Sequence, residues 1–100
     1  NLDLAHVIPQ SKKNEVVRLV NVIIESKVDI TRNYQDWFTI CCIIKNYFGA
    51  GGIVLFHDIS KLYPNYSPEE TEKLYSSIKQ WQYRYRSDRL FEIAAKYGIL

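Results

Sequence analysis

Apolar residues recur every three or four positions along most of the chain, and the pattern is densest between Asn33 and Phe48. One helical face of this stretch is formed by Tyr34, Trp37, Cys41, Ile44 and Phe48. This period predicts a helix, and its scarcity of polar residues predicts that the rest of the chain packs around it. Asn33 is a suitable N-cap, Asp36 suits the positive end of the helix dipole, and Gly49 suits the end of the helix. The sequence therefore predicts a central helix.

A second apolar stripe precedes the central helix, between Asn14 and Lys27. Its members are Val16, Leu19, Val20 and Ile23. The β-branched residues 22–24 would also suit a buried strand, but the run is long and lacks flanking turn residues, so we predict a helix capped by Ser11 or Asn14. Residues 1–11 contain Pro9 and lack a period, which predicts the tail of a linker.

Further helices are predicted after the central one. Residues 49–52 contain three glycines, which predict a tight turn between two helices. We do not expect a phosphate-binding loop here, because its sequence motifs are absent. A third helix is expected over residues 53–62, ended by Pro64. Ser67, Pro68 and Glu70 have the order of an N-cap, a first helical residue and a capping box. The buried face of this fourth helix is predicted to comprise Leu74, Tyr75, Ile78 and Trp81, and we expect its end to fray between residues 81 and 85.

A last helix is predicted over residues 88–96. Ser87 is its expected N-cap and Gly98 its C-terminal left-handed residue. The residues expected to face inward are Leu90, Phe91, Ala94 and Tyr97. The fold class predicted from these patterns is all-α, with about five helices around the central one, in a single domain of residues 12–100.

Composition supports a globular domain and excludes several classes. Of the 100 residues, 47% are hydrophobic, which is enough for a core that needs no metal or disulfide. Cys41 and Cys42 are adjacent in the central helix, so we predict reduced, buried thiols. No apolar run approaches the roughly 20 residues of a membrane span, and no signal peptide is visible, so we expect a cytoplasmic protein without a membrane partner.

The net charge of +2 does not by itself imply nucleic-acid binding, but the C-terminal third is basic. Residues 79–89 alternate cations with aromatic rings, a composition used by surfaces that bind single-stranded nucleic acid. The residues predicted to contact nucleic acid are Lys79, Tyr83, Arg84, Tyr85, Arg86 and Arg89. The alternative is that Trp81 and one tyrosine belong to the core while the arginines form a solvated face.

Other polar groups give no catalytic, cofactor or metal site. His57 and Asp58 lack the further ligands that zinc requires, so we predict a histidine on a helix face. Glu69, Glu70 and Glu72 are explained by their place in the first turn of a helix rather than by a bound cation. The two cysteines have no neighbouring base, which favours core packing over a nucleophile.

The order of several motifs resembles the second class of primase C-terminal domains, over about residues 34–99. The matching motifs are Tyr34-x-x-Trp37, Phe48-Gly49-x-Gly51-Gly52, Leu55-Phe56-His57-Asp58-Ile59-Ser60, Tyr66-Ser67-Pro68-Glu69-Glu70-Thr71 and Leu90-Phe91-x-Ile93-Ala94-x-x-x-Gly98. The sequence departs from the family at Phe56, Ile59 and Tyr75, where tryptophan is frequent, and in a longer, more aromatic segment 80–86.

The resemblance implies a helical accessory module of a DNA primase or primase-helicase from a phage or another mobile element, without catalytic activity of its own. It also implies flanking primase, helicase or ATPase domains in the same polypeptide. Two hypotheses follow for the domain itself. Either residues 79–89 contact single-stranded DNA, or the exposed aromatic residues couple the flanking domains without binding nucleic acid.

Overall fold

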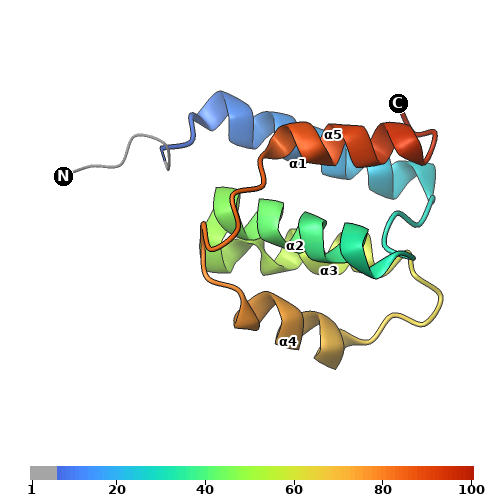
Figure 1. Cartoon of the computed structure of the whole chain (residues 1–100). Helices are drawn as coiled ribbons and strands as arrows, with labels where there is room; N and C mark the ends of the chain where they lie inside the picture. Colours follow the sequence, from blue (N-terminus) through green and yellow to red (C-terminus); the bar gives the residue numbers. More distant parts are fainter. Residues whose placement is uncertain (1–6) are drawn as a thin grey trace.

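The computed structural model describes residues 7–100, and its elements are helical. They are α1 (Gln10–Ser26), α2 (Tyr34–Phe48), the 3₁₀ helix η2 (Gly49–Gly52), α3 (Ile53–Ser60), α4 (Pro68–Ser77) and α5 (Ser87–Lys96). Figure 1 shows α1 and α5 side by side in one layer, α2 and α3 in the middle and α4 on the opposite side. No strand occurs between residues 7 and 100, so the predicted all-α class is confirmed for the part of the chain that the structure describes.

Helix α2 forms the centre of the core, as its pattern predicts. It packs against α3, α4 and α5, and the buried apolar residues that it contributes are Ile40, Cys41, Cys42, Ile43, Ile44 and Tyr47. From α1, the predicted residues Val16, Leu19, Val20 and Ile23 join this core. Tyr34 does not, because it stands at the first residue of α2 and its surface is 64% exposed.

The α2, η2 and α3 helices follow one another without a loop from Tyr34 to Ser60, so the predicted count of about five separate helices is slightly off. By length and composition alone, this 27-residue run could cross a membrane. However, Gly49 takes a left-handed φ of 62°, and α3 runs back beside α2 (Figure 1). The run is a folded pair of core helices, half of whose most apolar window is buried.

Most predicted caps are confirmed. Asn33 accepts hydrogen bonds from the backbone N–H groups of Gln35 and Asp36, at 2.8 and 3.3 Å. Ser67 Oγ accepts one from the N–H of Glu70 at 3.2 Å, with Pro68 in the first helical position. These bonds satisfy N–H groups that a helix start leaves without a partner.

At the C-terminal end, the predicted role of glycine is also confirmed. Gly98 takes a φ of 79°, and the following residue, Ile99, donates to the carbonyl of Ala94 at 2.9 Å. This arrangement ends α5 and uses a backbone conformation that residues with a Cβ rarely adopt.

The N-caps predicted for two helices are wrong. Ser11 and Asn14 both lie inside α1, which begins at Gln10 after Pro9, so part of the predicted linker is helical, whereas residues 1–6 lie outside the described chain. Ser87 lies inside α5 rather than before it. Its N–H donates to the hydroxyl of Tyr47 at 2.9 Å, so a side chain of α2 supplies the acceptor that a cap would otherwise provide.

The end of α4 also differs from the prediction. The helix stops at Ser77, well before the predicted fraying between residues 81 and 85, and Ile78 already has an extended backbone. Tyr75 and Ile78 are buried as predicted, while Leu74 and Trp81 are only partly buried. The physical reason lies in α2, which holds the segment after α4 in a non-helical path.

Cys41 and Cys42 are free and buried, as predicted. Burial raises the pKa of the Cys42 thiol to about 11, and it raises the pKa of the Cys41 thiol further, with an added contribution from its neighbour Cys42. Both thiols are therefore protonated at neutral pH and unsuited to nucleophilic chemistry.

Candidate nucleic-acid interface

The segment between α4 and α5 is organised by one buried amide. Asn46 lies in α2 with a relative exposure of 1%. Its Nδ2 donates to the carbonyl oxygens of Tyr83 and Tyr85 at 2.8 and 3.0 Å, and its Oδ1 accepts from the N–H of Trp81 at 2.5 Å. A single side chain thus satisfies three backbone groups of the segment, and such groups are costly to bury without partners.

The backbone of Asn46 makes a fourth contact with the same segment. Its carbonyl oxygen accepts a hydrogen bond from Gln80 Nε2 at 2.9 Å. At the next residue, Trp81 takes a φ of 62°, which is unusual for a residue with a Cβ. We attribute the end of α4 and this tight conformation to the hydrogen bonds from α2, which replace those of a continuing helix.

Five of the six predicted contact residues are exposed, and three of these five are Lys79, Tyr83 and Arg84 on the fixed segment. Lys79 and Arg84 form no ion pair with any residue of the described chain. Tyr83 is 41% exposed, and its ring meets the ring of Phe38 edge to face at a centroid distance of 5.0 Å. These residues present two positive charges and one accessible ring.

The other three predicted residues are held by neighbours. The guanidinium of Arg86 lies 5.1 Å from the ring centre of Trp81, and that of Arg89 lies 6.0 Å from the ring centre of Tyr85. Arg89 also meets Glu92 at 3.4 Å, and Tyr85 is half-buried. Each arginine keeps an exposed surface, but its guanidinium also contacts an aromatic ring or a carboxylate within the domain.

The alternative interpretation of this stretch agrees with the structure in part, because Trp81 and one tyrosine, Tyr85, pack partly buried against the core while the arginines are exposed. Trp81 is partly buried, and its ring lies 6.2 Å from that of Tyr47 in α2. Sequence reasoning missed Asn46, although a signal was present. Asn46 stands near the end of the central apolar stretch, one residue before Tyr47, and an amide there is costly to bury unless other groups bond to it.

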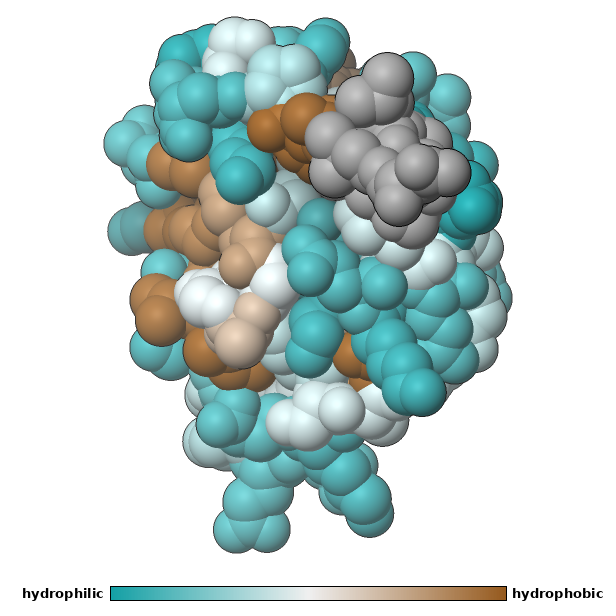
Figure 2. Space-filling model, turned by 90° about the vertical axis from the view of Figure 1, so that its left-hand side faces the viewer, coloured by the Kyte–Doolittle hydropathy of each residue, from teal (hydrophilic) through white to brown (hydrophobic). Residues whose placement is uncertain are grey.

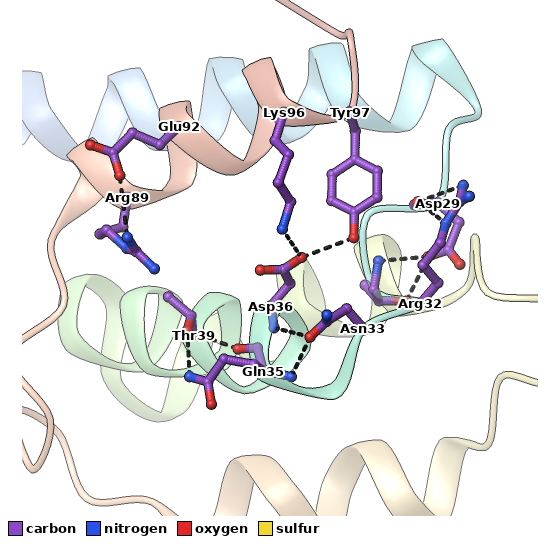
Figure 3. A network of polar contacts seen from close by, with 11 residues as sticks. Asp29, Arg32, Asn33, Gln35, Asp36, Thr39, Arg89, Glu92, Lys96 and Tyr97 are labelled. Atoms are coloured by element: carbon purple, nitrogen blue, oxygen red, sulfur yellow. Dashed lines mark hydrogen bonds and ion pairs between the residues drawn. The ribbon is translucent and has the colours of Figure 1, made fainter.

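A second polar network ties the start of α2 to the end of α5, as Figure 3 shows. Asp36 is buried, and its Oδ2 accepts from Lys96 Nζ at 2.6 Å and from the hydroxyl of Tyr97 at 2.9 Å. Burial first, and then the hydrogen bond and charge of Asp36, raise the pKa of Tyr97 to about 12. We interpret this network as structural, because it joins two helices and its acceptor is covered.

His57 is held on the face of α3. Its Nδ1 lies 2.6 Å from the hydroxyl of Tyr66, and its Nε2 lies 3.1 Å from Glu72. Among residues 7–100, no group of three or more His, Cys, Asp or Glu side chains is placed to hold a metal ion. The three predicted glutamates remain residues of the first turns of α4, and Glu72 serves as the partner of His57.

The fold and this surface define a small all-helical module with a fixed basic and aromatic segment. The chain matches the family model Primase C terminal 2 (PriCT-2) over residues 20–94. It therefore belongs to the PriCT-2 family, a family of accessory, non-catalytic domains of primases. The family suspected from the sequence motifs is thus confirmed. No curated protein and no solved structure gives a significant match.

Proposed function

We propose that this domain contacts single-stranded DNA through residues 79–89. The observation that supports the proposal is the fixed segment itself, in which Asn46 holds the backbone while Lys79, Tyr83 and Arg84 stay exposed. Cations on phosphates and rings on bases are the usual components of such surfaces. A segment that is already ordered loses little conformational entropy when the strand binds.

The charges set the expected strength and its dependence on salt. The segment offers four cations, Lys79, Arg84, Arg86 and Arg89, whereas Asp88 and Glu92 lie nearby and oppose a phosphate. For single strands, each neutralised phosphate contributes about −0.7 to the slope of log K against log salt. We therefore expect weak binding at physiological salt that becomes markedly tighter at low salt.

The family gives this contact its setting. A PriCT-2 domain has an accessory role in a primase, so the strand is proposed to be template or primed DNA held for a neighbouring catalytic domain. We further propose that the parent protein is a cytoplasmic primase or primase-helicase of a phage or mobile element. Its primase, helicase or ATPase domains would be the other partners.

Fluorescence anisotropy of a labelled oligothymidylate, measured at several salt concentrations, tests the proposal. The double variant Lys79→Ala/Arg84→Ala removes two charges that have no ion-pair partner among residues 7–100. If each charge meets one phosphate, the salt slope becomes less steep by about 1.4.

The matched control is Arg18→Ala/Lys73→Ala, which removes the same charge from exposed positions on α1 and α4. Its salt slope should stay close to that of the unsubstituted domain. Equal effects of the two double variants, or no binding even at low salt, would contradict the proposed contact.

A second candidate function, coupling of the flanking domains, is supported by exposed apolar residues. Val22 on α1 and Val54 on α3 are 44% and 63% exposed. Figure 2 shows hydrophobic side chains gathered over part of one face of the molecule. If coupling is the function, Val54→Asp should weaken binding to a separately produced neighbouring domain, while oligothymidylate should not bind.

A further inference from the structure

A cleft lined by aromatic rings lies at the opposite end of α2 from Asn46. Its volume is about 380 Å³, and the rings that line it belong to Tyr34, Trp37, Tyr63 and Tyr66. This volume lies within the range of sites that hold small planar molecules. None of residues 79–89 lines this cleft.

Two of these rings are fixed by the fold and two are accessible. Trp37 Nε1 donates to Ser60 Oγ at 3.0 Å, and the hydroxyl of Tyr66 lies 2.6 Å from a ring nitrogen of His57. In contrast, Tyr34 is 64% exposed and Tyr63 is 37% exposed. The cleft therefore combines rigid walls with rings whose faces a ligand can reach.

A strip of aromatic contacts connects this cleft with the basic segment. The ring of Tyr83 lies 5.0 Å from that of Phe38, which in turn stacks at 6.3 Å on Tyr34. Tyr34 lies 5.9 Å from Trp37 in the wall of the cleft. These ring spacings exceed the rise of about 3.4 Å between stacked bases, so a strand that follows the strip would have separated bases.

Polar groups at the cleft suit a nucleotide. The Arg32 guanidinium donates from Nε and Nη2 to the carbonyl of Asp29, at 3.3 and 3.2 Å, and it lies 5.4 Å from the ring centre of Tyr97. Its remaining N–H groups are available to a phosphate. Asn65 and Glu70 also line the cleft and can bond to the edge of a base, although the carboxylate would repel a phosphate close to it.

We propose that the cleft receives an unstacked base of the same DNA strand that contacts residues 79–89, with Tyr34 as the ring on which that base stacks. This inference rests on the proposed function, because the strip begins at Tyr83. The wide spacing of the rings gives it a distinctive consequence. Strands of thymidine, which stack weakly, bind more tightly than strands of adenosine of equal length.

The test uses the whole domain and labelled oligothymidylates of about twelve nucleotides, a length within the usual range of single-strand sites. Tyr34→Ala should weaken binding about 5-fold to 140-fold, the effect of losing one base–aromatic stack. Tyr34→Phe keeps the ring and should bind as the unsubstituted domain does. Val54→Ala alters an equally exposed apolar residue on α3 and serves as the control.

A second readout reports on the cleft directly. The chain has two tryptophans, so Trp81→Phe leaves Trp37 as the sole one, and oligothymidylate should change its fluorescence. Salt-dependent binding that is unaffected by Tyr34→Ala, with unchanged Trp37 emission, would overturn the cleft proposal and leave the contact at residues 79–89 intact. Absence of all DNA binding would instead remove the proposed function and the cleft proposal together.

Discussion

Replacement of Asn46 by leucine tests whether one buried amide organises the segment between α4 and α5. The change keeps the approximate size of the side chain but removes the partners of the Trp81 N–H and of the Tyr83 and Tyr85 carbonyls. A buried polar group left without a partner costs about 1–3 kcal/mol. The segment is partly exposed, so water can replace some of these bonds, and we expect a total loss of about 3 kcal/mol.

Urea unfolding measures this loss. With an m value of about 1.5 kcal/mol/M, which suits a chain of this size, the midpoint should fall by about 2 M. Thr39→Val is the matched control, because Thr39 is also buried in α2 but its hydroxyl donates within the helix, to the carbonyl of Gln35 at 2.8 Å. Thr39→Val should lower the free energy of unfolding by about 0.5–1.5 kcal/mol, the contribution of one ordinary hydrogen bond.

Hydrogen exchange locates the effect of Asn46→Leu. The Trp81 amide should lose its protection in this variant, whereas amides in the middle of α1 should change only with global stability. The reasoning is refuted if Asn46→Leu is no more destabilising than Thr39→Val, or if the Trp81 amide remains protected.

Two further predictions concern the core and the network at the end of α5. In Gly52→Ala, the new Cβ would lie 2.7 Å from Ile44 Cγ2, so we expect the free energy of unfolding, measured by heat or urea, to fall by about 1–3 kcal/mol. Gly51→Ala is the control and should be nearly neutral, because no other heavy atom lies within 4 Å of its Cβ. The neutral Tyr97 phenol contributes stability that is complete below its ordinary pKa of 10.0 and is lost as the pH rises towards about 12. Asp36→Asn should therefore lower the pKa of Tyr97, and an ultraviolet titration in which both proteins ionise alike would contradict this.

The fold could be predicted in outline because most of its boundaries are local. Asn33, Gly49 and Ser67 act on groups within a few residues of themselves, so their roles follow from the order of residues alone. Ser87 shows where this reasoning fails. Its sequence context is that of a cap, but its N–H bonds to Tyr47, and a contact between residues forty positions apart has no local signal.

The residue types of the candidate surface were predicted from the sequence, but the contacts that fix its backbone were not. The basic and aromatic residues of 79–89 are visible in the sequence, whereas their fixed backbone depends on Asn46, which lies on another helix. The cleft could not be predicted either, because helical periodicity assigned Tyr34 to the core. Periodicity gives the direction of a side chain around the helix, but not whether a neighbouring element covers the end of that helix.

The central helix determines how the two proposed contacts are placed relative to each other. Asn46 fixes the basic segment near the C-terminal end of α2, and Tyr34 stands at its first residue. The ring of Phe38 in α2 lies 5.0 Å from that of Tyr83 and 6.3 Å from that of Tyr34, so the spacing of the two contacts exists before any strand binds. A strand that binds at one contact has already lost its translational and rotational freedom. The second contact then adds affinity without a further loss of this freedom and without ordering the protein. Under the proposed function, this fixed geometry would compensate for the modest net charge of +2.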